Sequence, residues 1–233
     1  MTESSADGTP AAGDDADYQA AVIDLLGAIA YGELSAFERL AEDAKMAPSL
    51  EDKIAIGAMA AHEFGHLKRL QERLEELGAD PFAAMAPFER ALDDFHAHTA
   101  PSDWYEGLIK AYVGDALAAD FYREIAAYLD ADTRQLVIDA LEDAGHAEFV
   151  VDRVRAGIAR DSRLGGRLAL WGRRLMGEAL TQAQRVAAER DALTALLAGG
   201  VDRPGLDLAA LGRMFTRLTE RHAQRMADLG LDS

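Results

Sequence analysis

The sequence predicts an all-α protein, and three observations support this fold class. The chain has 233 residues, of which 49% are hydrophobic, which is enough for one large helical domain. Alanine, leucine, arginine and glutamate are abundant, whereas β-branched residues are sparse and aromatic residues make up 7%, a composition that favours helices over strands. Apolar residues recur every three to four positions in most segments, which is the period of an amphipathic helix.

Charge and cysteine content limit the partners and ligands of the protein. The formal charge is -17, from 41 acidic and 24 basic side chains, and it opposes a broad electrostatic contact with nucleic acid or anionic lipid. The chain contains no cysteine, so any metal must be held by oxygen and imidazole. The lack of disulfides suits the reducing cytoplasm, where we expect the protein to be located.

The N-terminal residues 1–17 are rich in Ser, Gly, Ala and Asp, and they lack the basic start and apolar core of a signal peptide. We expect them to form a disordered acidic tail. No uncharged apolar run approaches the roughly 18 to 20 residues that span a bilayer, so we expect a soluble protein without a membrane partner.

Two long helices are expected after this tail. The first covers residues 18 to about 45, ends before Pro48, and carries Glu33 on its apolar stripe. An ionised carboxylate there is costly unless it is paired or bound to a metal. The second opens with Ser49 as N-cap and stops at Gly78. Its expected inner face is Ile54, Ile56, Met59, Ala60, Glu63, His66, Leu67, Leu70 and Leu74.

Two further helices follow a connection over residues 79–100, which is too long for a tight hairpin and is interpreted as a crossover. Asp103 with Glu106 resembles a capping box and predicts a helix from there to about residue 129, with Asp115 on its apolar stripe. A fourth helix is expected over residues 132–158. It carries Asp143 and His146 on one face.

The remaining residues, 159–233, are expected to pack on the bundle within the same domain. Two helices are predicted there, over residues 168–198 and 206–229. The stretch 153–174 contains seven arginines and is the markedly basic part of the chain. We interpret it as a solvated face that complements the acidic bundle, with contact to phosphate or RNA as the alternative.

The segment His62-Glu63-x-x-His66 admits two interpretations. It has the form of a zincin motif, but the third histidine of a metzincin is missing and the chain shows no strand pattern to hold a peptide substrate. As Glu63-x-x-His66 it is instead one ligand pair, and Asp143-x-x-His146 repeats it. Glu33 and Asp115, each preceded by glycine, repeat in the same way, so the two halves look like a duplicated helix pair.

Together these six residues share helical spacing, lie on the inner faces of their predicted helices, and repeat between the two halves of the chain. It resembles the ligand set of the ferritin-like superfamily of di-iron or di-manganese carboxylate proteins, in which two helices each give a carboxylate and two others each give a Glu-x-x-His pair. Residues 18–158 carry the resemblance. The crossover, the glycines beside the ligands and the two added helices are most similar to the branch of the tRNA methylthio-isopentenyl-adenosine hydroxylase. The candidate ligands are Glu33, Glu63, His66, Asp115, Asp143 and His146.

The resemblance implies roles for these residues. Glu63 and Asp143 would bridge two iron ions, or two manganese ions as an alternative. Glu33 and Asp115 would be terminal ligands, and the two histidines would each bind one ion. The family usually has glutamate at the positions of Asp115 and Asp143, which are each one methylene shorter. His62 falls outside the set, because it aligns with Glu142 in the repeat.

The resemblance further implies a monooxygenase that hydroxylates an unactivated carbon with electrons from a separate donor protein. Its substrate would be a tRNA or a small apolar molecule, and a tRNA would require the basic stretch 153–174 for its phosphates. A homodimer is left open. The alternative function is a metal-free helical bundle that acts as a binding or assembly module. Ferritin-like iron oxidation and zinc proteolysis are the minor alternatives.

Overall fold

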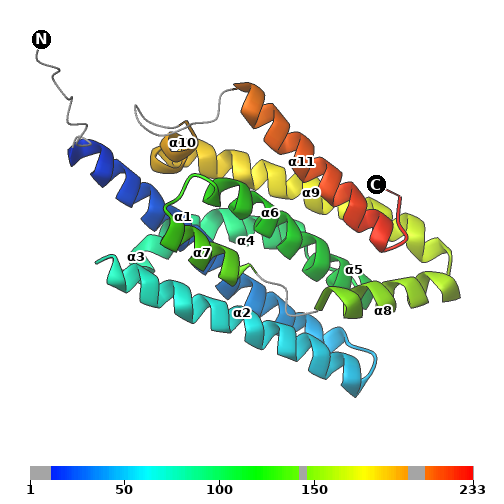
Figure 1. Cartoon of the computed structure of the whole chain (residues 1–233). Helices are drawn as coiled ribbons and strands as arrows, with labels where there is room; N and C mark the ends of the chain where they lie inside the picture. Colours follow the sequence, from blue (N-terminus) through cyan, green and yellow to red (C-terminus); the bar gives the residue numbers. More distant parts are fainter. Residues whose placement is uncertain (1–11, 142–145, 199–207, 233) are drawn as a thin grey trace, which may run out of the picture.

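The computed structural model describes residues 12–141, 146–198 and 208–232, and for residues 12–15, 146, 197–198 and 208 it describes only the backbone. All regular structure in these ranges is helical, which confirms the all-α class (Figure 1). The main elements are α1 (Ala12–Asp43), α2 (Leu50–Glu76), α3 (Pro81–Met85), α4 (Glu89–His98), α5 (Trp104–Ile109), α6 (Asp115–Ala126), α7 (Ala131–Ala140), α8 (His146–Arg160), α9 (Arg163–Glu189), α10 (Asp191–Ala198) and α11 (Leu208–Asp228).

Helices α1 and α2 pack along each other as the longest helix pair of the fold. The Ser49 side chain accepts a hydrogen bond from the Asp52 amide at 3.1 Å, which confirms the predicted N-cap of α2. Gly78 follows α2 with a positive φ of 75°, a conformation that glycine adopts without strain. Two predictions need correction: α1 begins at Ala12, inside the expected tail, and Ile54 is 64% exposed.

The third helix of the bundle starts as expected and then departs from regular geometry. The Asp103 side chain accepts from the Glu106 amide at 3.0 Å, and Glu106 in turn accepts from the Ser102 amide at 2.8 Å. After α5 the chain forms a π-helical segment, Lys110–Gly114, before α6 begins at Asp115. This insertion was not predicted. Such π-bulges occur often at functional sites.

The fourth helix is not continuous, contrary to the prediction of one helix over residues 132–158. Helix α7 ends at Ala140, where Leu141 leaves the helical conformation, and α8 begins at His146. The predicted helix 168–198 is also divided, because the backbone of Arg190 leaves the helical conformation between α9 and α10. The Arg190 side chain is paired with Asp24 of α1, so this break is tied to the bundle.

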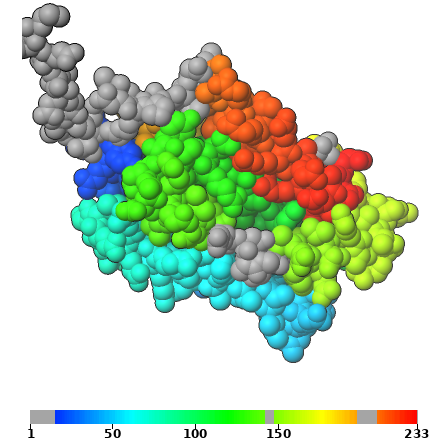
Figure 2. Space-filling view, in the orientation of Figure 1, coloured from blue at the N-terminus to red at the C-terminus, as the bar shows by residue number. Residues whose placement is uncertain are grey.

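The C-terminal helices cover the third helix of the bundle. Helix α9 contacts α4, α5 and α8, and α11 contacts α6 and α9. In the space-filling view α11 lies over the green surface of α6, opposite the edge formed by α2 (Figure 2).

Buried apolar residues form two clusters along the bundle. On α1, Ala30 belongs to one cluster and Leu40 to the other, and on α2 the same holds for Leu67 and Met59. Between these positions lie the polar residues of the candidate site. The fold therefore holds a polar layer where the two apolar clusters meet.

The span Ala16–Met46 is long and apolar enough to cross a membrane by length and composition alone. However, 61% of its apolar window is buried inside the protein. The buried carboxylate of Glu33 lies within this span. We therefore describe α1 as a core helix of the bundle.

Replacing Gly27 by alanine is expected to destabilise the protein by about 3 kcal/mol, because overpacking against backbone cannot be relieved by a rotamer change. A Cβ atom at Gly27 of α1 would lie 2.2 Å from the carbonyl oxygen of Ala84 in α3. The matched control is Gly57→Ala in α2, where a Cβ meets nothing within 4 Å and is expected to be neutral or stabilising. Urea unfolding measures both, and equal free energies of unfolding for the two variants would contradict this prediction.

Candidate metal centre

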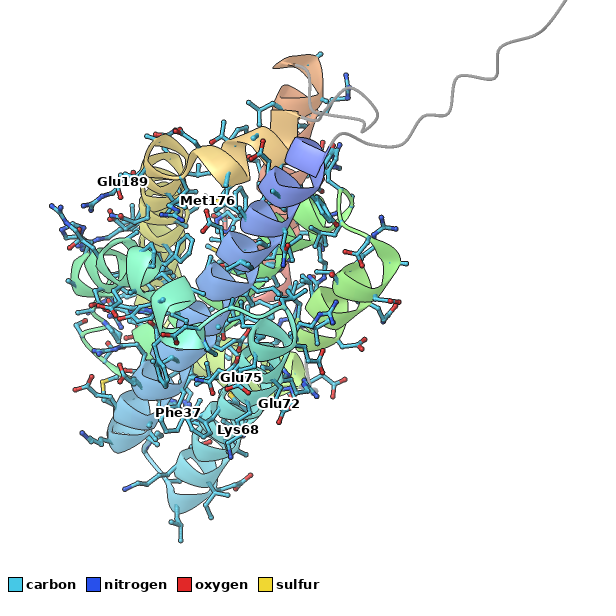
Figure 3. All side chains as sticks on the ribbon, turned by 90° about the vertical axis from the view of Figure 1, so that its left-hand side faces the viewer. Phe37, Lys68, Glu72, Glu75, Met176 and Glu189 are labelled. Carbon is cyan, nitrogen blue, oxygen red and sulfur yellow. The ribbon has the colours of Figure 1, made fainter. Side chains whose placement is uncertain are left out.

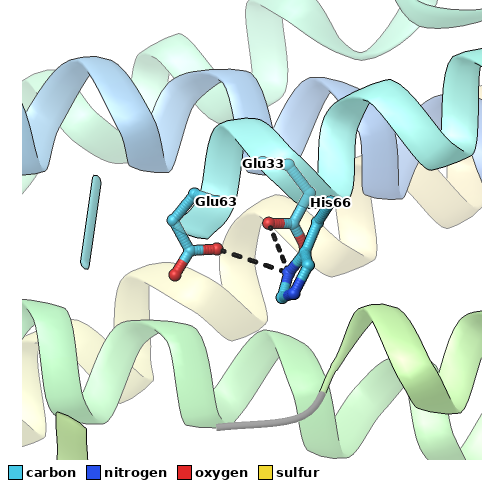
Figure 4. A group of neighbouring side chains, drawn as sticks. All are labelled: Glu33, Glu63 and His66. Atoms are coloured by element: carbon cyan, nitrogen blue, oxygen red, sulfur yellow. Dashed lines mark ion pairs between the residues drawn. The ribbon is translucent and has the colours of Figure 1, made fainter. Parts of the chain in front are cut away.

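Three of the predicted ligands form a compact group between α1 and α2. Glu33 comes from α1, and Glu63 and His66 come from α2, one turn apart on the same face (Figure 4). Their candidate ligand atoms all lie within 4.8 Å of one another. His66 Nδ1 is 3.5 Å from Glu33 Oε2 and 3.9 Å from Glu63 Oε2. The two carboxylates therefore converge on one nitrogen of the imidazole ring.

Three polar atoms of this group are buried without hydrogen-bond partners among the described residues. Glu33 is 8% exposed and His66 is 4% exposed. Glu33 Oε2 and both ring nitrogens of His66 have no partner there. An unsatisfied buried polar atom costs about 1 to 3 kcal/mol, so several of them in one group indicate a place for a further partner, such as an ordered water or an ion. A cation held by carboxylate oxygen and imidazole nitrogen is one such partner, and these donors suit iron, manganese or zinc.

Electrostatics at the group also favour a cation. Burial raises the pKa of the Glu33 carboxyl to about 7; a hydrogen bond with Glu63 opposes the shift, and the charge of Asp115 adds to it. Burial lowers the pKa of the His66 imidazole, while the charge of Glu63 opposes that shift. Below about pH 7 the Glu33 carboxyl is mostly protonated, and burial disfavours the charged form of His66. The neutral imidazole is the form that binds a metal.

A cavity of about 310 Å³ adjoins the three ligands. It is bounded by α2, by the π-helical segment with α6, and by α7 and α8. Asp115, the first residue of α6, lines this cavity, so the fourth candidate ligand faces the same space. Its side chain is exposed, however, and it is not part of the compact group. The sequence had placed Asp115 in an apolar setting, and this expectation is wrong.

The second predicted ligand pair, Asp143 and His146, falls at the gap between α7 and α8. Asp143 lies outside the described residues, and for His146 the structure describes only the backbone at the start of α8. The adjacent α8 residues Ala147 and Val150 line the same cavity as the three grouped ligands. The roles of Asp143 and His146 as ligands therefore stay predictions.

His62 also lines the cavity. Its ring meets the ring of His66 edge to face, with centroids 4.2 Å apart. It is not part of the compact ligand group. The described residues contain no strand that could hold a peptide beside α2, which weighs against the zincin interpretation.

Charged residues at the opposite wall of this cavity were not predicted from the sequence. Arg123 of α6 and Arg225 of α11 line it. Both contact Asp120, which is 3% exposed, and Arg225 donates to it at 2.5 Å. The neighbouring Glu124 accepts two hydrogen bonds from Arg217. No sequence signal links α6 to α11 at these positions, because the partners lie about a hundred residues apart.

The basic stretch 153–174 is largely engaged within the chain. Arg153 pairs with Asp52 at 2.6 Å, and Arg167 pairs with Asp103 and Glu106. Three more donate to acceptors of the chain: Arg160 to a tyrosine hydroxyl, and Arg173 and Arg174 to backbone carbonyls. These contacts agree with the interpretation of the stretch as a face that complements the acidic bundle.

Comparison with known proteins assigns the chain to a family. A search of curated proteins finds no match. The family described as "Ferritin-like domain, actinomycetes" matches residues 16–200, which is most of the chain and includes nearly all of α1 to α10. This agrees with the all-helical fold and with the carboxylate and histidine group between α1 and α2. The chain belongs to the ferritin-like domain family of actinomycetes.

Proposed function

We propose that this protein is a non-haem di-iron oxygenase that hydroxylates an organic substrate at the cavity beside Glu33, Glu63 and His66. The observation that carries the proposal is the group of three ligands with buried, unpartnered donor atoms on Glu33 and His66. The ferritin-like fold is its context, since this fold builds metal sites from inward-facing carboxylate and histidine side chains. Two bound irons would supply the electrons that reduce O2.

The residues of the chain have separate tasks in this proposal. Glu33, Glu63 and His66 bind the metal, with Asp115, Asp143 and His146 as the predicted remaining ligands. In the metal-free protein burial raises the pKa of the Glu33 carboxyl to about 7, so Glu33 would release a proton when it binds the metal. Burial and the charge of Glu33 raise the pKa of the Tyr122 phenol, so this hydroxyl stays protonated beside the site.

A tRNA substrate receives less support than a small molecule. The formal charge of -17 opposes contact with phosphates, and five of the seven arginines in the stretch 153–174 are engaged within the chain. The proposal therefore takes a small organic molecule as the substrate.

Anaerobic loading with Fe(II) tests the metal site. We expect about two irons per chain, as in ferritin-like carboxylate proteins, and loss of most of this iron in Glu63→Ala and His146→Ala. The matched control is His62→Ala. This variant loses an imidazole one turn from His66, but His62 is not a member of the ligand group, so the variant should keep its iron. Metal content is measured after desalting.

Two outcomes of this experiment contradict the proposal. A wild-type protein that takes up no iron would favour the metal-free bundle. If His62→Ala loses its metal while Glu63→Ala keeps it, the site is of the His-Glu-x-x-His type, in which the two histidines bind the metal and the glutamate acts as a base. Oxygen uptake with excess Fe(II) and no other reductant then separates two functions. A protein that stores iron keeps oxidising the added Fe(II), whereas a protein with only a two-iron site stops once its bound iron is oxidised.

A further inference from the structure

A second cavity, of about 180 Å³, lies on the other side of α6 from the candidate metal centre. It is lined mainly by α1, α4, α6, α9 and α10, with one residue from α11. Figure 3 shows Met176, one of its lining residues, on the side of α9 that faces the bundle, whereas Glu189 at the end of the same helix points outward. Its walls are apolar, with Leu25, Phe88, Phe95, Leu117 and Leu193 among them.

The cavity carries very little polarity. Of the residues that line it, the polar ones are Tyr122, Gln182 and Thr194, and none of them is charged at neutral pH. The amide nitrogen of Gln182 already donates to Glu178 at 2.8 Å, and the Thr194 hydroxyl donates to the carbonyl of Ala187 at 2.9 Å. Ala187 and Thr194 are exposed, so the cavity reaches the surface between α9 and α10.

Helix α6 separates this cavity from the metal centre. Ala118 lines the apolar cavity and Ala119, the next residue, lines the cavity of the metal centre. Tyr122 lines the apolar cavity, and its hydroxyl lies close to α1 at Gly32, where an added Cβ would be 3.7 Å from it. Since Gly32 precedes Glu33, the Tyr122 side chain reaches from the apolar cavity toward the ligand group.

The size and lining of the cavity identify the class of molecule that it can hold. An engineered protein cavity of about 150 Å³ lined by Leu, Ile and Phe binds benzene, so a cavity of this size accommodates one small ring system. An ionised ligand would lose its hydration and meet no opposite charge in the lining, which costs several kcal/mol. We propose that the α4–α6–α9 cavity is a binding site for a small, uncharged, mainly apolar molecule of the size of one or two fused rings. None of the candidate metal ligands that the structure describes lines it, so this site is independent of the proposed function.

Calorimetric titration of the metal-free, full-length protein with indole tests the site. We expect saturable binding of about one indole per chain and at least about tenfold weaker binding of indole-3-carboxylate, because the carboxylate cannot be solvated in the cavity. Ala118→Phe and Ala183→Phe each place a ring in the cavity from a different helix, and each should weaken indole binding at least about tenfold. The matched control is Ala119→Phe, which fills the cavity of the metal centre instead and should bind indole as the wild type does.

The two cavity-filling variants lie on different helices, α6 and α9, so misfolding of one variant does not invalidate the test with the other. Circular dichroism identifies a variant that has lost its helices. The proposal is overturned if the wild-type protein shows no saturable indole binding, or if a folded cavity-filling variant binds indole as tightly as Ala119→Phe. Equal affinity for indole and its carboxylate would overturn it as well. Failure of iron loading leaves these results unchanged, so the two proposals fail separately.

Discussion

Glu33→Gln is expected to stabilise the metal-free protein at pH 8 by up to about 3 kcal/mol. The pKa of Glu33 is raised from 4.5 to about 7, so the folded state resists ionisation of this carboxyl. A difference of one in pKa between the folded and unfolded states corresponds to about 1.4 kcal/mol. The penalty is absent below pH 4.5, grows between pH 4.5 and 7 as the unfolded state ionises, and is constant above pH 7. Glutamine keeps the shape of the side chain without the charge.

Urea unfolding of chelator-treated wild type and Glu33→Gln at pH 4.5 and pH 8 measures this effect. The stability difference should be small at pH 4.5 and should rise toward pH 8. The same variant should lose iron, because an amide is a poor ligand where a carboxylate is required. A variant that is less stable than wild type at pH 8 would show that the Glu33 carboxylate is satisfied by the protein itself.

Glu33→Gln also connects stability with function. Glu33 must lose its proton when it binds a metal. The affinity of the site for the metal therefore rises with pH. Since Glu33 titrates near pH 7, we expect the affinity for Fe(II) to rise several-fold between pH 6 and pH 7 in the wild type.

Asp120→Ala is expected to destabilise the protein by about 3 to 5 kcal/mol, which is typical when one partner of a buried ion pair is removed. Asp120 is 3% exposed and accepts from Arg225 of α11; Arg221 of α11 lies 3.5 Å away and Arg123 of α6 lies 3.4 Å away. Without this carboxylate the Arg225 guanidinium stays largely buried and unpaired. The contact between α6 and α11 should weaken first.

Urea unfolding measures the loss of stability, and limited proteolysis should show earlier cleavage within α11. The control is Glu220→Ala, an exposed acid on α11, which should change the free energy of unfolding by less than about 0.5 kcal/mol. A loss below about 1 kcal/mol in Asp120→Ala would mean that this cluster contributes little to holding α11 in place. Arg225 also lines the cavity of the metal centre, so Asp120→Ala tests whether Asp120 holds Arg225 in place at that cavity.

Much of the fold could be predicted because its signals are local. Ser49 and Asp103 cap helices through hydrogen bonds to amides three residues away, and Gly78 ends α2 through its own backbone conformation. Local signals also predicted half of the candidate site, namely Glu33, Glu63 and His66. Glu63 and His66 share a face because they are three residues apart on one helix, and Glu33 was found as an acid on an apolar stripe.

The features that the sequence did not indicate depend on contacts between distant segments. The π-helical segment before Asp115 and the break after Ala140 interrupt helices whose periodicity continues through them. The exposure of Asp115 likewise depends on what packs opposite α6, which no local pattern encodes. The two cavities on either side of α6 have the same origin.

The sequence by itself determined an all-helical protein, its helix caps and the shared helix face of Glu63 and His66, since periodicity and short-range hydrogen bonds fix these. The tertiary structure alone decided that Glu33 reaches Glu63 and His66, and that Asp115 faces their cavity from across it. It also placed an apolar cavity behind α6 and joined Asp120 to α11. The physical reason is that burial and charge pairing arise only when helices far apart in the chain pack against each other.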